Sequence, residues 1–232
     1  MRLRLLSICL LLGVITHTAP AQTESYRDFD NFNTAADASV VNCFIQDPSG
    51  LIWLGTNKGL YSYNGFGTQL HTWTPAASRI KTDTKINCGL LYNHHTLCLG
   101  TDNGVLFYNI LTDNYESSPV AFPADVRSLV LQGNQLRIGS LNGLYSYDTA
   151  RHTLSNFDQK QLTGIPNRTI YSLLRSRDNT LYVGTYNGLC YLPANATRFR
   201  TIDLTALSGK STLLVNALLE DWRNRCIWIG TE

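Results

Sequence analysis

The stretch Leu51–Leu60 reads LIWLGTNKGL and is the clearest copy of a repeat that decides the fold. Further copies read LCLGTDNGV, LRIGSLNGL, LYVGTYNGL and IWIGTE, at 97–105, 136–144, 181–189 and 227–232. Their first glycines lie at 55, 100, 139, 184 and 230, which gives a period near 44 residues. Such a period is typical of β-propeller blades and differs from the roughly 34 residues of helical repeats.

Each copy consists of apolar runs separated by turn residues. In the first copy we expect strands over 40–45, 51–56 and 60–63. Asp47–Gly50 reads as a turn, with proline at its second position and a glycine free to take positive φ. Asn-Gly pairs at 103–104, 142–143 and 187–188 predict tight hairpins, because both residues tolerate positive φ. A short final strand with an aromatic residue completes a four-stranded blade, the candidate aromatics being Trp73, Phe157 and Phe199.

The unit boundaries follow from aligning the N-terminal residues with the repeat. Tyr26–Phe29 precedes Val40 much as Leu70–Trp73 precedes Ile86, so the first unit is expected to begin near residue 26. The sequence predicts an all-β protein, with β-propeller repeats of four-stranded blades. About five units in an incomplete, open ring are expected over 22–232, with blades near 26–65, 69–109, 113–148, 153–192 and, truncated, 197–232.

The first 21 residues read as a secretory signal peptide. Arg2 and Arg4 precede an apolar run over 5–15, and Ala19–Ala21 offers the small residues of a cleavage site. The run is well short of the roughly 20 residues that a membrane span needs. We therefore expect cleavage after Ala21 and a chain exported to the periplasm.

Composition and charge exclude other classes of protein. Hydrophobic residues make up 44% of the chain and charged residues 16%, which does not fit a disordered protein. The net charge is +2, and removing the leader leaves 17 basic and 17 acidic side chains. Such a balance gives no attraction to nucleic acid, so no nucleic-acid partner is expected.

Five cysteines remain after the leader, an odd number without a CxxC pair. Their positions in the repeat place them within strands, where we interpret them as small apolar residues rather than metal ligands or reactive thiols. They are Cys43, Cys88, Cys98, Cys190 and Cys226.

The segment Ile45–Gly65, IQDPSGLIWLGTNKGLYSYNG, resembles the two-component regulator propeller repeat. The resemblance covers about 26–232. It is looser in the second unit, where 93–96 reads NHHT in place of the usual Asp-x-x-Gly turn. It is also looser in the third unit, where 132–135 reads QGNQ and Ser140 replaces threonine.

The resemblance implies a ligand-sensing segment of a hybrid two-component system sensor. Members of the family recognise oligosaccharides derived from glycans and signal to a histidine kinase beyond an inner-membrane anchor. This chain contains no kinase, ATP-binding or membrane module, so the implied partners are further blades, kinase modules and an oligosaccharide, and a homodimer remains open. We expect no enzyme activity, no cofactor and no membrane contact from this chain itself, although the full-length family member would be a histidine kinase.

Several side chains invite a catalytic or metal-binding interpretation. Asp47–Gly50 could be a metal loop, but one aspartate in each turn is too few for calcium and is better explained as turn chemistry. His94 and His95 are expected at a solvated hairpin tip. Asp47 followed by Trp53 is also similar to the Asp-box of sialidase propellers. Those enzymes need an arginine cluster that binds the substrate carboxylate, together with a tyrosine and a glutamate. None of the four glutamates lies near a suitable set of arginines (Glu24, Glu116, Glu220 and Glu232).

Four tryptophans are candidates for sugar stacking. Trp53 and Trp228 share one repeat position, so a core role is favoured for both. Trp222 lies in a turn and is the more exposed candidate. No catalytic or metal residue is assigned, and the ligand-binding residues stay unassigned.

Two alternatives to a sensor remain, a carbohydrate-active lyase or hydrolase on a propeller scaffold and a secreted propeller that binds proteins. Paired carboxylates near a central channel would favour the enzyme. An open ring predicts apolar end surfaces, and hence poor solubility or self-association of the chain alone.

Overall fold

A computed structural model of the chain describes residues 40–72, 84–116, 124–156, 164–204, 209 and 213–232. The chain divides into two units, 1–30 and 31–232, and every described residue lies in the second. The expected leader, the expected strand over Tyr26–Phe29, Trp73 and Phe157 lie outside the described residues.

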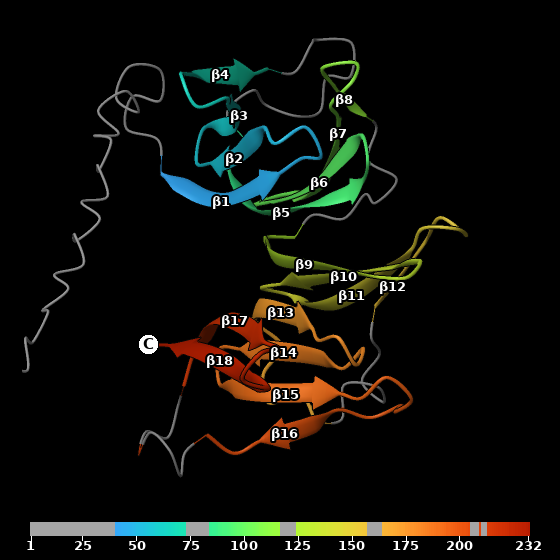
Figure 1. Cartoon of the computed structure of the whole chain (residues 1–232). Helices are drawn as coiled ribbons and strands as arrows, with labels where there is room; N and C mark the ends of the chain where they lie inside the picture. The colour runs from blue at the N-terminus through green and yellow to red at the C-terminus, as the bar shows by residue number, and fades with distance from the viewer. Residues whose placement is uncertain (1–39, 73–83, 117–123, 157–163, 205–208, 210–212) are drawn as a thin grey trace, which may run out of the picture. The chain divides into compact units, whose positions relative to one another are not determined.

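Eighteen strands form five antiparallel sheets in the described part of the chain (Figure 1). The first sheet contains β1 (Val41–Gln46), β2 (Ile52–Thr56), β3 (Gly59–Tyr63) and β4 (Thr68–His71). The second contains β5 (Ile86–Asn93), β6 (Thr96–Thr101), β7 (Gly104–Asn109) and β8 (Asn114–Glu116). The third contains β9 (Val126–Gln132), β10 (Gln135–Ser140), β11 (Gly143–Asp148) and β12 (Thr153–Asn156). The fourth contains β13 (Ile170–Arg175), β14 (Leu181–Thr185), β15 (Gly188–Leu192) and β16 (Arg200–Ile202), and the fifth contains β17 (Val215–Asp221) and β18 (Cys226–Thr231).

Each four-stranded sheet is a meander in which every strand pairs with the next one along the chain. The first strand of each sheet packs beside the first strand of the following sheet. Within the described residues, the fifth sheet has no such packing against the first, so the blades close no ring. The all-β, four-stranded and open architecture expected from the sequence is confirmed.

The sheets divide the chain differently from the expected unit boundaries. The expected boundaries place β4 at the start of the second unit. In the structure β4 instead pairs with β3 and belongs to the first sheet. A loop of four residues, 64–67, joins this pair, whereas 14 residues separate β4 from β5. The short loop keeps β4 in its own sheet. Phe199 lies one residue before β16 and is buried, so the final strand does not itself carry that aromatic.

The Asn-Gly hairpins differ in detail from the expectation. In the second sheet Thr101 pairs with Gly104, so Asp102 and Asn103 are the two turn residues. Only the glycine takes positive φ, 103° at Gly104, and Asn103 does not. The Thr101 hydroxyl accepts a hydrogen bond from the Asn103 amide and donates one to the Gly104 carbonyl. These bonds hold the turn without a second left-handed residue, and the hydroxyls of Thr56, Ser140 and Thr185 make the same pair.

Close packing explains the first glycine of the first four repeats, both within the sheet and between sheets. A Cβ atom on Gly55 would lie 2.6 Å from Cγ2 of Ile86, the first residue of β5. The same clash recurs at the next three junctions, 2.6 Å to Val126 for Gly100, 2.7 Å to Ile170 for Gly139 and 2.7 Å to Val215 for Gly184. A β-branched residue therefore fills the space that glycine leaves open in the preceding sheet, and we call this contact the glycine junction.

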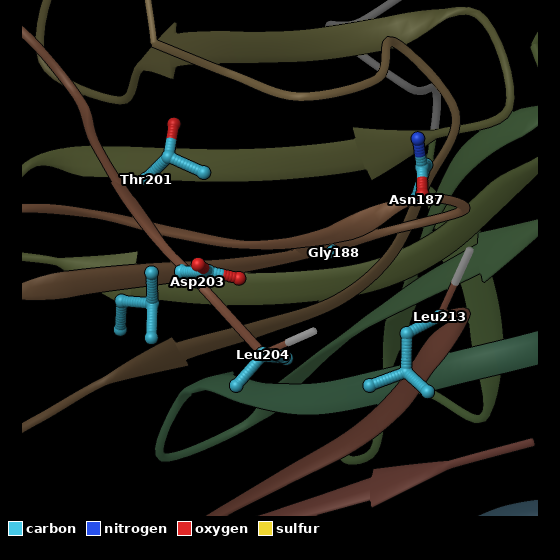
Figure 2. Close-up of a pocket in the computed structure, with 7 residues that line it drawn as sticks. Asn187, Gly188, Thr201, Asp203, Leu204 and Leu213 are labelled. Carbon is cyan, nitrogen blue, oxygen red and sulfur yellow. The ribbon is translucent and has the colours of Figure 1, made fainter. Parts of the chain in front are cut away.

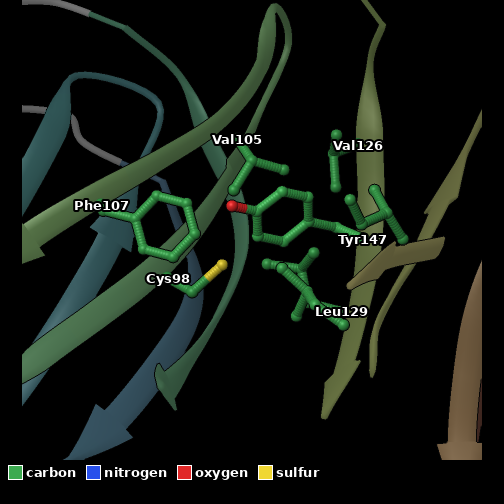
Figure 3. Packing of buried hydrophobic residues seen from close by; sticks show 8 residues of the cluster. Cys98, Val105, Phe107, Val126, Leu129 and Tyr147 are labelled. Atoms are coloured by element: carbon green, nitrogen blue, oxygen red, sulfur yellow. The ribbon is translucent and has the colours of Figure 1, made fainter. Parts of the chain in front are cut away.

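Apolar clusters complete each junction. Figure 3 shows Cys98, Val105 and Phe107 of the second sheet packed against Val126, Leu129 and Tyr147 of the third. Leu129 lies three residues after Val126, the valine of the glycine junction, and packs against the preceding sheet. The core of this protein thus lies between successive blades.

Candidate functional site

The Asp47 turn is built by hydrogen bonds to one carboxylate. Oδ1 accepts the Ser49 and Leu51 amides at 2.8 and 3.2 Å, and Oδ2 accepts the indole N–H of Trp53 at 2.9 Å. Gly50 takes positive φ, as expected. Burial of Asp47 raises its pKa, but the hydrogen bonds from Ser49, Trp53 and Leu51 outweigh this and hold the pKa below 3.8. This carboxylate is fully occupied by its own hairpin, which supports turn chemistry at this position.

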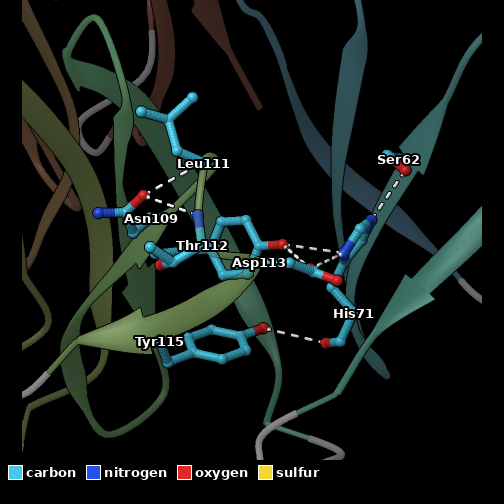
Figure 4. A network of polar contacts seen from close by, with 8 residues as sticks. Ser62, His71, Asn109, Leu111, Thr112, Asp113 and Tyr115 are labelled. Atoms are coloured by element: carbon cyan, nitrogen blue, oxygen red, sulfur yellow. Dashed lines mark hydrogen bonds and ion pairs between the residues drawn. The ribbon is translucent and has the colours of Figure 1, made fainter.

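A polar network joins the first two sheets (Figure 4). His71, the last residue of β4, contacts Asp113 with Nδ1 at 2.7 Å and the Ser62 hydroxyl with Nε2 at 2.8 Å. The Tyr108 hydroxyl donates to Asp113 and lies 2.9 Å from His71 Nδ1. The hydrogen bonds from Tyr108 and His71 lower the pKa of Asp113. Burial, reinforced by Asp113, raises the pKa of Tyr108.

Ser62, His71 and Asp113 are bonded in the order of a nucleophilic triad. The low exposure of Ser62 and His71 argues against that role. Ser62 is 7% exposed and His71 8% exposed, and Ser62 lies in the middle of β3. The Trp53 ring packs 4.9 Å from the His71 ring and 5.2 Å from that of Tyr108. No substrate carbonyl can reach the Ser62 oxygen past this packing. The network instead fixes β4 to the turn between β7 and β8.

Sequence reasoning missed this network, although the repeat holds a signal for it. Tyr108 and Tyr147 both lie eight residues after a repeat glycine, and Asp113 and His152 both lie thirteen after it. Asp113 and His152 both take positive φ, and the Tyr147 hydroxyl lies 2.8 Å from Nδ1 of His152. A tyrosine paired with a polar left-handed residue five positions later is thus a second repeated element.

Two tryptophans at one repeat position have opposite environments. Trp53 is 2% exposed, which confirms the core interpretation. Trp228 is 61% exposed, so the same interpretation is wrong for that residue. The physical reason is its surroundings, because β18 has no described partner equivalent to β3, and Trp228 has no counterpart of His71 and Tyr108 beside it.

Trp222 lies in the turn between β17 and β18 and is 51% exposed, so its expected exposure is confirmed. The expectation that it is more exposed than Trp228 is wrong, because Trp228 is 61% exposed. The guanidinium carbons of Arg177 and Arg223 lie 4.3 and 5.3 Å from its ring centre. The Arg177 amide also donates to the Glu220 carboxylate at 3.0 Å, which ties the two neighbouring turns together. We call Trp222, Arg177 and Arg223 the Trp222 patch.

A separate small pocket of about 230 Å³ lies in the fourth sheet (Figure 2). Apolar Ile202, Leu204 and Leu213 and polar Asn187, Thr201 and Asp203 line it, together with Gly188. It is bounded by the β14–β15 turn and the segment after β16. Among the residues that the structure describes, its lining holds one carboxylate and no arginine or histidine.

The remaining candidates stay apart. His94 and His95 occupy the exposed tip between β5 and β6, as expected. Glu116 ends β8, while Glu220 and Glu232 lie at opposite ends of the β17–β18 hairpin. In the part of the chain that the structure describes, no three histidine, cysteine or carboxylate side chains come close enough to hold a metal ion.

The five cysteines are free thiols within strands, as expected. Burial raises the pKa of Cys43 to about 11 and that of Cys190 to about 12. Burial also raises the pKa of Cys88 and Cys98. These four thiols are therefore protonated at neutral pH and are poor nucleophiles.

Residues 36–58 and 164–187 match the family model described as two component regulator propeller. These segments contain the Asp47 turn of the first sheet and the β14 hairpin of the fourth. The chain carries two-component regulator propeller repeats.

Several solved structures of extracellular domains are similar to this chain. The extracellular domain of the putative hybrid two component system BT4673 from B. thetaiotaomicron is 49% identical, with a TM-score of 0.76, over 85% of this chain and 26% of that one. A second crystal structure of that domain, described as belonging to a putative one component system, has a TM-score of 0.77. The extracellular domain of the putative system BT3049 has a TM-score of 0.67 over 82% of this chain and 27% of that one. At 19% identity it shares only the fold.

This propeller chain spans about a quarter of the length of these neighbours. The neighbours are described as extracellular domains, and neither description names a catalytic domain. Comparison with curated proteins found no match. Among the described residues, no helix has the length and apolar character that a membrane crossing requires.

Proposed function

We propose that this chain is a ligand-sensing propeller segment of a hybrid two-component system sensor. The observation that carries the proposal is the 49% identity to the extracellular domain of BT4673 over 85% of the chain. The buried Asp47 carboxylate, the four protonated cysteines and the buried Ser62 support binding rather than catalysis as the role of the described surface. The partner that receives the signal is a histidine kinase module outside this chain.

The proposed ligand is an oligosaccharide derived from a glycan. The Trp222 patch supports this, because it presents two arginines beside an exposed aromatic ring, and arginine guanidiniums pair with carboxylate or sulfate groups. Two arginines beside one indole favour an acidic sugar over a neutral one. The ligand contact is therefore proposed at the turns between β13 and β14 and between β17 and β18.

Titration calorimetry of the full chain with neutral and uronic-acid oligosaccharides tests this proposal. Binding of the acidic set, lost in Trp222→Ala and weakened in Arg177→Ala, is the expected result. Phe66→Ala is the matched control, since Phe66 is an aromatic residue 88% exposed in a different sheet. Equal binding by wild type and Trp222→Ala would show that the Trp222 patch is not the ligand site, and it would leave the proposed sensor role unchanged.

The sensor role is tested in the same samples by chromatography of the sugars after incubation. A sensor leaves every oligosaccharide unchanged. Release of monosaccharide that is abolished by changing a single carboxylate would favour the propeller enzyme instead.

A further inference from the structure

The turn between β13 and β14 is held in one conformation by hydrogen bonds at its C-terminal end. The Ser176 hydroxyl donates to the Thr180 carbonyl at 3.0 Å, and Asn179 takes positive φ, 65°. The Arg175 guanidinium donates to Oδ1 of Asn179 at 2.6 Å. From the third sheet, the side-chain amide of Gln132 donates to the Asn179 carbonyl at 3.0 Å. These bonds fix the part of the turn that carries Asn179.

Glu220 of β17 fixes the other part of the same turn. Its two carboxylate oxygens accept the backbone amide of Arg177, at 3.0 and 3.2 Å. Arg177 follows β13 of the fourth sheet, and the two residues lie 43 positions apart in the chain. Because an ionised acceptor makes a stronger hydrogen bond than a neutral one, this contact is a specific polar link between two successive sheets.

The side chain of Arg177 reaches the ring of Trp222 from the position that Glu220 holds. Its guanidinium carbon lies 4.3 Å from the ring centre, within the range of a cation–π contact. The guanidinium carbon of Arg223 lies 5.3 Å from the same ring. The ring therefore contacts one arginine of the preceding sheet and one of its own turn. The Trp222 patch is thus assembled across the boundary between the fourth and fifth sheets.

The charges of the patch favour an anion. In the described part of the chain, neither arginine of the patch forms an ion pair. The Glu220 oxygens contact the backbone amide of Arg177. Two cations held against one aromatic ring repel each other, and an anion bound between them removes this repulsion.

We propose that Glu220 is a positioning residue of the Trp222 patch, which sets the preference for acidic sugars by holding Arg177 over the Trp222 ring. This inference rests on the function proposed above for the patch. With its backbone anchored, Arg177 loses less conformational freedom when an anionic group binds, so a smaller entropic cost opposes binding. Arg223 is anchored within its own turn, where its amide donates to Asp221 at 3.1 Å. Loss of the Glu220 contact therefore weakens the grip of Arg177 on an acidic sugar and changes the affinity for a neutral sugar little.

The charge of Glu220 and its hydrogen bond to Arg177 have opposite effects on an anionic ligand, which separates the two roles. A negative charge near the arginines repels an anion, so a purely electrostatic role predicts tighter binding in both Glu220→Gln and Glu220→Ala. A positioning role predicts that only Glu220→Ala changes the patch, and that it weakens binding. The carboxamide oxygen of glutamine still accepts the Arg177 amide, whereas alanine offers no acceptor.

Titration calorimetry of the full chain with a trisaccharide of galacturonic acid and a trisaccharide of galactose tests the effect on binding. Glu220→Ala is expected to bind the acidic trisaccharide about five- to tenfold more weakly than the wild type, because a hydrogen bond to a charged group is lost. Glu220→Gln is expected to bind it at least as tightly as the wild type. In an Arg177→Ala background, Glu220→Ala should cause no further loss, because its effect passes through the Arg177 side chain.

The matched control is Glu116→Ala, which removes an exposed carboxylate from β8 of the second sheet and changes the net charge equally. It is expected to bind both trisaccharides as the wild type does. Circular dichroism checks that each variant keeps its strands. If Glu220→Ala loses them, Glu220→Val removes the same acceptor with a residue that favours strands.

NMR of the 15N-labelled full chain tests the positioning without any ligand. The Arg177 guanidinium lies over an aromatic ring, so the ring current should move its Nε–H proton signal upfield. Loss of the signal in Arg177→Lys assigns it. The upfield shift should disappear in Trp222→Ala, become smaller in Glu220→Ala and persist in Glu220→Gln.

Three results would each overturn the proposal: an unchanged Arg177 signal in Glu220→Ala, tighter acidic binding by that variant, or an equal loss of binding when Arg177 is already alanine. Failure of the wild type to bind the acidic trisaccharide would instead contradict the ligand proposed for the patch. The Arg177 signal decides the positioning role of Glu220 in that case as well.

Discussion

At the scale of single residues, the repeat glycines are required by close approach and not by backbone freedom. Gly55, Gly100, Gly139 and Gly184 lack positive φ, yet a β-branched side chain of the next sheet occupies the volume of their missing Cβ. This explains why the repeat keeps glycine in the middle of a strand, where it is otherwise unfavourable.

The change Gly100→Ala is expected to destabilise the protein by about 1–3 kcal/mol, because the new methyl group overlaps Sγ of Cys88 in the same sheet and Cγ1 of Val126 in the next one. Urea denaturation followed by circular dichroism measures it. Gly67→Ala is the control, since no atom lies within 4 Å of a Cβ there, and its stability should stay within about 0.5 kcal/mol of the wild type. An equal loss in both variants would contradict the junction role of Gly100.

At the scale of elements, each hairpin carries its own polar stabilisation. The Asp47 carboxylate holds the β1–β2 turn and the Trp53 indole, while Asp221 accepts the Arg223 and Asn224 amides in the β17–β18 turn. The His71 network then joins one sheet to the next through side chains from β3, β4 and the β7–β8 turn. Local hydrogen bonds thus build the hairpins, and a few long-range ones align them.

Asp47→Ala is expected to cost about 1–3 kcal/mol, because it leaves the buried Trp53 N–H without its acceptor. The folded pKa of Asp47 lies below 3.8, so its charged form stabilises the folded state above that pH. As the pH falls through the lowered folded pKa, this contribution disappears. The stability difference between wild type and variant should therefore shrink below pH 4. Melting curves between pH 2.5 and 7 measure it, and a constant difference would contradict the role of the charge.

At the scale of the whole molecule, the core is distributed among the junctions, so each blade depends on its neighbours. The exposed apolar residues gather on both end sheets, with Phe44 on the first and Leu219 and Trp228 on the fifth. A repeat protein of this kind leaves its junction surfaces exposed wherever no neighbour covers them.

Export of the molecule is expected to depend on its first 21 residues. N-terminal sequencing of protein recovered from the periplasm should begin at Gln22, because Ala19 and Ala21 provide the small residues before the cleavage site. Deleting 2–15 should retain the protein in the cytoplasm. Recovery of an intact Met1 in the membrane fraction would contradict a cleaved signal.

The sequence by itself determined the strands, the hairpin turns and the number of repeats. These depend on local chemistry, since alternating apolar runs and residues such as Asp47 and Gly104 specify strands and turns within a few positions. The exposed Trp222 and the hairpin tip at His94 and His95 were predictable for the same reason.

Only the tertiary structure decided which surfaces meet. Trp53 and Trp228 have the same local sequence context, yet one is buried and the other exposed, because burial depends on the neighbouring sheet. The His71 network joins residues up to 51 positions apart, from Ser62 to Asp113. The contact between His71 and Asp113 arises from how two sheets pack, and no single repeat contains both of these residues.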